Sequence, residues 1–114
     1  MRLVDSSTVE IQGDFIEPTK SSDGSPLTDL AYSTIYITSP AGTIKSPQIP
    51  ASKAAGGGAR SLLMLISAPN GAKTTVSFSA TSTDIAGNES SKTPPVVFVI
   101  DRVGPETPSN FTIG

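Results

Sequence analysis

Val9-Glu10-Ile11-Gln12-Gly13-Asp14-Phe15 is the stretch that decides the fold. Its odd positions are apolar or small, and its even positions are polar. A period of two is typical of a strand with one buried face, whereas an amphipathic helix repeats about every 3.6 residues. The stretch therefore predicts a protein built on sheets.

Further stretches have the composition of strands, at residues 31–38, 62–66, 74–80 and 96–100. They are rich in β-branched and aromatic residues, or form short apolar runs between turn residues. A helix across 59–66 is an alternative for one of them, because Ala, Leu and Met are good helix formers. The piece from Thr43 to Ser52 contains two prolines, which restricts it to a sheet edge or an extended connection. Together these segments predict an all-β fold.

The chain has 114 residues, with ten glycines and ten prolines, which favours one domain made of many short elements. We expect the domain to cover residues 1–101. Beyond it, Gly104-Pro105-Glu106-Thr107-Pro108 is typical of a stiff linker, so 102–114 is predicted to be a linker or C-terminal arm. Within the domain, residues 51–59 include Gly56-Gly57-Gly58 and predict a mobile loop with nothing to bury.

The absence of cysteine and histidine excludes several kinds of chemistry. Disulfides, thiolate nucleophiles, Cys/His zinc sites and imidazole acid–base catalysis all require these residues. The net charge of −2 provides no basic surface for nucleic acid or anionic lipid. The first residues lack the apolar core of a signal peptide, and no segment approaches the apolar length of a membrane span. We therefore expect no cofactor, no nucleic-acid partner and no membrane partner.

Carboxylates remain as the candidates for catalysis or metal binding. Asp23 with Asp29, and Asp84 with Glu89, are the pairs that a hydrolase could use, but short loops at the end of a small domain rarely form such a cleft. Asp84, Asn88 and Glu89 could also supply oxygen ligands to calcium, although no calcium-loop spacing is present. The favoured interpretation is that Asp84 caps its own turn and Asn88 takes the left-handed conformation there. No catalytic or metal-binding residue is predicted.

Two separated motifs resemble those of a known family. Asp23-Gly24-Ser25-Pro26-Leu27-Thr28-Asp29-Leu30-Ala31, followed by Ile35-Tyr36, resembles the B–C loop and the start of strand C in bacterial and phage fibronectin type III domains. Ala80 through Asp84-Ile85-Ala86-Gly87-Asn88-Glu89-Ser90 resembles the end of strand F and the F–G turn. The resemblance covers roughly residues 8–101. It implies an immunoglobulin-like β-sandwich of fibronectin type III topology, with about seven strands in two antiparallel sheets.

The resemblance also shows departures from the family. Phe15 falls where the family usually has a core tryptophan on strand B, and Val76 falls where it usually has the tyrosine of the tyrosine corner. Strand A is reduced to Met1–Ser7, whereas 105–113 resembles such an opening strand. The favoured interpretation of 105–113 is a linker toward a following domain. The alternative is donation of Phe111–Ile113 as a strand to a neighbouring copy.

The resemblance implies a non-catalytic structural or interaction module, acting as a spacer or adhesion domain. Its setting would be a phage virion, as a tail, fibre or capsid-associated component, or the extracellular or cell-surface space of a bacterium. The alternative is a carbohydrate-binding accessory domain of a secreted polysaccharide-acting enzyme. Candidate contact residues are Tyr32, Tyr36, Phe111 and Ile113. One of the two tyrosines could face outward as a contact anchor, but core packing is the favoured use of both. The expected partner is protein, from neighbouring domains or subunits, with glycan as the alternative ligand.

Overall fold

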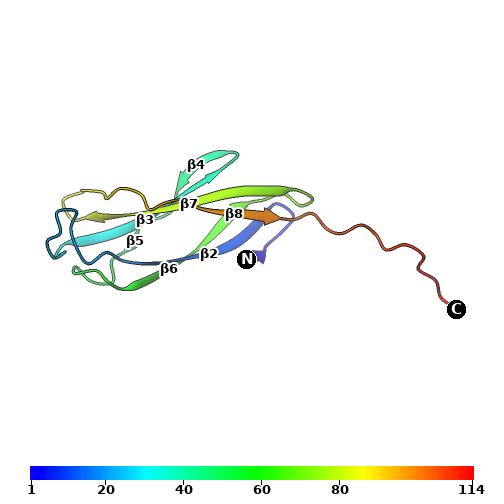
Figure 1. The fold of residues 1–114 in the computed structure, drawn as a ribbon, viewed down its shortest axis with the longest axis horizontal. Helices are drawn as coiled ribbons and strands as arrows, with labels where there is room; N and C mark the ends of the chain where they lie inside the picture. The colour runs from blue at the N-terminus through cyan, green and yellow to red at the C-terminus, as the bar shows by residue number, and fades with distance from the viewer.

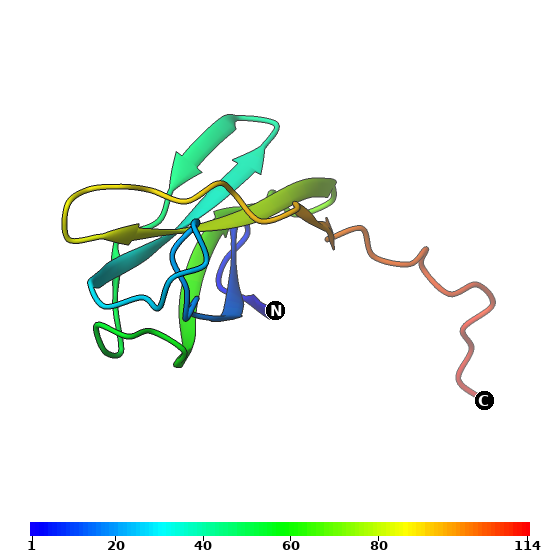
Figure 2. The same ribbon diagram turned by 60° about the vertical axis from the view of Figure 1, so that its left-hand side comes forward.

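The computed structural model describes all 114 residues and contains eight strands and no helix. The strands are β1 (Arg2–Leu3), β2 (Thr8–Ile16), β3 (Leu30–Ser39), β4 (Gly42–Lys45), β5 (Ile49–Pro50), β6 (Ala59–Ser67), β7 (Lys73–Asp84) and β8 (Val96–Asp101). They form two antiparallel sheets that face each other (Figures 1 and 2). The predicted all-β sandwich is confirmed. The count exceeds the expected seven or so because β1 and β5 are strands of two residues each.

The smaller sheet has the order β1-β2-β6, and the larger sheet has the order β4-β3-β7-β8 with β5 also paired to β3. Every pairing between strands is antiparallel. Strand β6 pairs with β2 over its whole length, so the alternative of a helix across 59–66 is wrong. The turn from β6 to β7 carries the chain from one sheet to the other.

Alternation along the strands puts one face of each sheet into a common core. Val9, Val76 and Ile100 are completely buried there, from β2, β7 and β8. Phe15 and Phe78 are half-buried and pack against the same cluster. The core cluster as a whole contains Val9, Ile35, Ile37, Ile49, Met64, Ile66, Ala68, Val76 and Ile100. The period of two in 9–15 is thus explained by burial between the sheets.

Strand β6 is only half-buried, although its sequence is a continuous apolar run. Met64 and Ile66 point into the core, whereas Leu63 and Leu65 lie exposed on the outer face of the smaller sheet. The run therefore obeys the same alternation as β2, because one face of the sheet borders solvent.

Strands β4 and β5 form the outer edge of the larger sheet, next to β3. The edge position predicted for the stretch from Thr43 to Ser52 is therefore confirmed. Pro50 can occupy an edge because it has no N–H to donate to a further strand.

A buried carboxylate holds the glycine-rich stretch that follows β5. Glu17 accepts hydrogen bonds from the backbone N–H of Ser52 at 2.9 Å, from the Ser52 hydroxyl, and from the backbone N–H of Gly58 at 3.0 Å. Gly56 is buried with a φ of 69°, and a Cβ there would collide with the carbonyl oxygen of Pro18. The expectation that this stretch has nothing to bury is wrong, because its backbone packs on the end of β2.

The chain leaves the sandwich after β8. Residues 103–114 are exposed and run beyond the end of the sheets, which gives the molecule a length of 73 Å against 28 and 21 Å in the other directions (Figures 1 and 2). No helix has the length and apolar character needed to cross a bilayer.

Candidate functional site

One side of the sandwich is open, because β1 is too short to close it. Strand β1 pairs with β2 only through Arg2 opposite Glu10 and Leu3 opposite Val9. The edge of β2 from Ile11 to Ile16 therefore has no neighbouring strand. On the facing sheet, β8 is also an edge strand. A groove of about 580 Å³ lies between these two edges.

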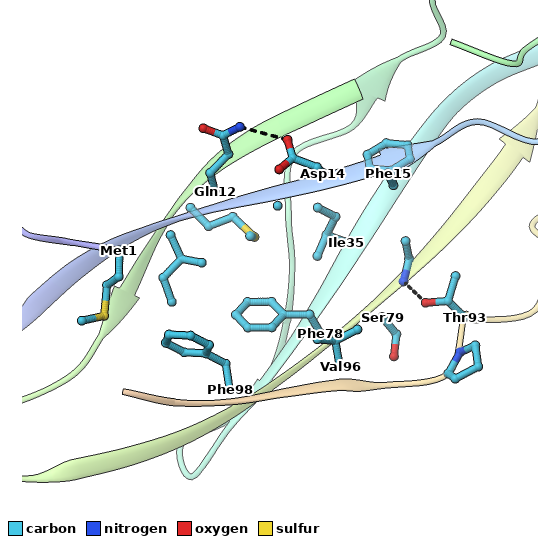
Figure 3. A pocket seen from close by; sticks show the side chains of 15 residues that line it. Met1, Gln12, Asp14, Phe15, Ile35, Phe78, Ser79, Thr93, Val96 and Phe98 are labelled. Carbon is cyan, nitrogen blue, oxygen red and sulfur yellow. Dashed lines mark hydrogen bonds between the residues drawn. The ribbon is translucent and has the colours of Figure 1, made fainter. Parts of the chain in front are cut away.

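The groove is lined mainly by apolar side chains from both sheets. Figure 3 shows Phe78, Val96 and Phe98 on the larger sheet pointing toward β2, with Met1 at one end of the groove. The complete lining is Met1, Ile11, Gln12, Gly13, Asp14, Phe15, Ile35, Met64, Phe78, Ser79, Ala80, Thr93, Pro94, Val96 and Phe98. Such a surface can bind an apolar side chain, because Asp14 is the one charged residue in it.

Strand β8 shows where the cover is missing. Its residues Val96, Phe98 and Ile100 alternate onto the face that points toward the smaller sheet, since Val96 lies opposite Phe78 and Ile100 opposite Thr74. Ile100 is 0% exposed, but Phe98 is 40% and Val96 is 65% exposed. Exposure thus increases from the covered end of β8 to the end that borders the groove. Val96 and Phe98 therefore face inward but stay partly uncovered.

A polar cluster lies on the outer face of the larger sheet, around Tyr36. Its hydroxyl donates a hydrogen bond to the carboxylate of Glu89, which also accepts one from the Thr81 hydroxyl at 2.7 Å. The ammonium groups of Lys92 and Lys45 lie 4.3 and 5.4 Å from the centre of the Tyr36 ring. The hydrogen bond to Glu89 raises the pKa of Tyr36, and the bonds from Tyr36 and Thr81 lower the pKa of Glu89.

The candidate carboxylates are engaged within their own turns. Asp84 accepts hydrogen bonds from the side-chain and backbone nitrogens of Asn88, at 3.0 and 2.8 Å, and these bonds lower its pKa. Asp23 accepts bonds from the hydroxyl and backbone of Ser25, which lower its pKa in the same way. The prediction that Asp84 caps its turn is confirmed. The prediction for Asn88 is wrong, because Gly87 takes the left-handed conformation with a φ of 92°.

Glu89 does not complete a calcium site with Asp84 and Asn88. Its carboxylate turns to Tyr36 and Thr81, whereas the carboxylate of Asp84 turns to Asn88. No three His, Cys, Asp or Glu residues come close enough together to hold a metal ion. The geometry therefore gives these side chains roles in turns and in hydrogen bonding across the sheet.

The four candidate contact residues lie in two separate places. Tyr32 and Tyr36 are half-buried on the outer face of the larger sheet, since Ser33, Ile35 and Ile37 take the alternate positions of β3 that face the core. The expectation that the tyrosines pack in the core is therefore wrong. Phe111 and Ile113 are exposed on the C-terminal arm. The structure does not bring the two pairs together.

Sequence reasoning did not identify the groove residues of β8. The available signal was the combination of a very short opening strand with an apolar stretch at 96–100. A missing edge strand leaves the inward side chains of its neighbours uncovered. Comparison of the chain with protein-family models, with curated proteins and with solved structures finds no match.

Proposed function

We propose that this chain is a non-catalytic structural module of the fibronectin type III kind, which contacts other proteins as a spacer or adhesion domain. The observation that carries the proposal is the apolar groove between two unpaired sheet edges. Such an edge binds another polypeptide through main-chain hydrogen bonds, while the groove takes alternate side chains. A small-molecule site would instead combine an enclosed cavity with convergent polar groups.

The strand order supports the fibronectin type III part of the proposal. The segments that resemble the start of strand C and the end of strand F lie in β3 and β7, and β8 follows the segment that resembles the F–G turn. These three strands are neighbours in one sheet. The segment that carries the strand B position, β2, pairs with β6 in the other sheet. This division of strands is the one that the sequence resemblance implies.

The state of the carboxylates supports the non-catalytic part. A general acid or base at neutral pH needs a pKa moved toward 7, which burial or a like charge provides. The pKa values of Asp23, Asp84 and Glu89 are all moved downward by hydrogen bonds. Each of these groups is therefore held as a carboxylate that accepts hydrogen bonds.

The carbohydrate-binding alternative depends on an aromatic ring with a free face on which a sugar can stack. The ring of Tyr36 has the ammonium group of Lys92 over it at 4.3 Å, which favours the structural role. A virion, a cell surface or the extracellular space is the setting that we propose for the module, and it rests on the sequence resemblance.

A glycan array with the whole chain tests the proposal against this alternative. A structural module binds none of the glycans above the level of a denatured control. Binding that is lost in Tyr36→Ala and kept in Tyr36→Phe would instead show a carbohydrate-binding domain that uses this ring. Hydrolysis of a polysaccharide by the purified chain would contradict the non-catalytic assignment.

A further inference from the structure

The C-terminal arm, residues 102–114, has two apolar side chains near its end that nothing covers. Phe111 is 84% and Ile113 is 89% exposed. They are two positions apart, so they point the same way when the arm is extended as a strand. The groove also has uncovered apolar surface, because Val96 and Phe98 stay partly exposed there. The arm and the groove therefore complement each other.

We infer that the groove binds the arm of a second copy of this chain, as an added strand antiparallel to β2. The inference rests on the proposed structural function and names the partner. It requires that the arm fits β2 in register, and that the arm reaches the groove of another copy more readily than its own.

Strand β1 sets the register for an added strand. It runs antiparallel to β2 with Arg2 opposite Glu10. When this register is continued, Met1 falls opposite Ile11. In the structure no strand pairs with this edge of β2 from Gln12 to Ile16, so an added strand can occupy it in this register.

This register places the apolar side chains of the arm in the groove. If Ile113 of the second copy lies opposite Gly13, its Phe111 lies opposite Phe15. Side chains directly opposite each other lie on the same face of a sheet, and the odd positions of β2 face the core. The apolar ends of Met64 and Ile35 lie over Gly13, so Ile113 would pack beside them.

The rest of the arm agrees with the same register. Thr112 lies opposite Asp14, on the outer and polar face of the sheet. Pro105 and Pro108 fall beyond Ile16, where β2 ends, so their missing N–H groups remove no hydrogen bond from the ladder.

The direction of the arm favours a second copy over the same chain. Arg102 is fixed at the end of the sandwich where β2 begins. It donates hydrogen bonds to the carbonyl oxygens of Ala68 and Ala72, and the N–H of Ala68 donates one to the carbonyl oxygen of Ser7. An arm antiparallel to β2 must enter from the other end. The same chain would have to cross about seven positions, or roughly 23 Å, and then reverse, while Val103 to Phe111 spans at most about 27 Å.

The same geometry predicts the form of the assembly. Each copy receives an arm at the end where β2 stops and sends its own arm out from the opposite end. A reciprocal pair of oppositely oriented copies would require each arm to reverse after it leaves its sandwich, whereas copies joined head to tail in an open row need no reversal. A row of this kind places successive sandwiches end to end, as expected for a spacer.

Four lysine variants of the whole chain test the inference by sedimentation velocity over a wide range of concentration. Wild type is expected to form species that grow with concentration. Ile113→Lys puts a charge in the groove and is expected to weaken association at least about a hundredfold, whereas Thr112→Lys faces out beside a carboxylate and retains it. In the copy that receives the arm, Val96→Lys is expected to abolish association and Val97→Lys to retain it. Val96 and Val97 are about equally exposed in the free chain, at 65% and 62%, so both variants are expected to fold.

A cysteine pair tests the register, because the chain has no cysteine of its own. Asp14→Cys with Thr112→Cys places the two thiols directly opposite each other, at a spacing that a disulfide can bridge. Oxidation is expected to give a ladder of linked chains on a non-reducing gel. Asp14→Cys with Asn110→Cys is the control, displaced by two positions, and is expected to link poorly.

Several results would overturn the inference. They are a wild-type chain that stays monomeric at every concentration, a closed dimer as the end point, equal effects of the lysines at 96 and 97, or a disulfide formed within one chain. A monomeric chain that binds no glycan would remove the inference and leave the proposed function intact. Glycan binding by a chain that still assembles would do the reverse.

Discussion

The carboxylate of Glu17 is expected to stabilise the sandwich more than any other polar side chain. The residue is 3% exposed and accepts three hydrogen bonds, two from Ser52 and one from Gly58. These bonds attach the loop before β6 to the end of β2. Replacement by alanine would leave three donors without their acceptor.

The size of the effect follows from these bonds. A hydrogen bond to a charged group contributes about 1.5–3 kcal/mol, and bonds that share one acceptor are not additive, so we expect about 3–5 kcal/mol for Glu17→Ala. Glu17→Gln keeps the shape but turns one oxygen into a donor that faces a donor, so we expect about 2–3 kcal/mol. Ser52→Ala removes only the hydroxyl, and we expect about 1 kcal/mol. A domain of this size has about 5–15 kcal/mol in total, so Glu17→Ala could unfold a large share of the molecules.

The effect of Glu17 depends on pH in a predictable direction. Burial alone would raise its pKa, but the hydrogen bonds from Ser52 and Gly58, together with the charge of Arg60, bring the pKa below its usual value. A lowered pKa in the folded state means that the stabilisation is complete above the unfolded value of about 4.3 and is lost as the pH falls through the folded value. The difference between wild type and Glu17→Gln is therefore full at pH 7 and shrinks below about pH 4.

Urea unfolding, followed by far-ultraviolet circular dichroism at several pH values, measures these differences. The expected order of stability is wild type, Ser52→Ala, Glu17→Gln and Glu17→Ala. The reasoning would be refuted if Glu17→Ala unfolded at the wild-type urea concentration, or if wild type and Glu17→Gln lost stability in parallel on acidification.

Three further predictions concern the core, a backbone position and the outer face. Ile100→Ala should lower the free energy of unfolding by about 2–5 kcal/mol, and Val97→Ala on the same strand by less than about 0.5 kcal/mol, in urea unfolding; similar values would contradict the assignment of faces on β8. Gly56→Ala should lower the free energy of unfolding by more than about 1 kcal/mol, because φ at this position is positive and the added Cβ would meet a carbonyl oxygen. An unchanged melting temperature would disprove this. Glu89→Gln should lower the pKa of Tyr36, because the hydrogen bond to the carboxylate holds the phenol proton. Ultraviolet titration of a variant that lacks Tyr32 measures this pKa, and an unchanged value would contradict the prediction.

Much of the sandwich could be predicted from the sequence, because burial between two sheets leaves a period of two. Val9 to Phe15 shows it, and the exposed Leu63 and Leu65 follow the same alternation although the run is apolar throughout. The alternation along β3 would also have placed Tyr32 and Tyr36 on the outer face, since Ile35 points inward and lies an odd number of positions from each of them.

The role of Glu17 could not be predicted in the same way. Its hydrogen-bond donors lie 35 and 41 residues further along the chain, and no local pattern connects them. Composition alone suggested that a run of three glycines has nothing to bury, whereas the small residues allow the backbone to approach the end of β2. The groove could be predicted only in part. The reduced strand A indicated an open edge, but it did not show which inward side chains of β8 would be exposed.

The attachment of the arm to β8 has a mechanical consequence. Six residue pairs join β8 to β7, and the arm continues in the direction in which β8 runs (Figure 1). Tension applied through the arm would load these pairs in shear, so they must yield together instead of opening one after another. A molecule pulled from its C-terminus in a force microscope should therefore resist more strongly than one pulled across its strands, and equal rupture forces would show that β8 does not carry the load.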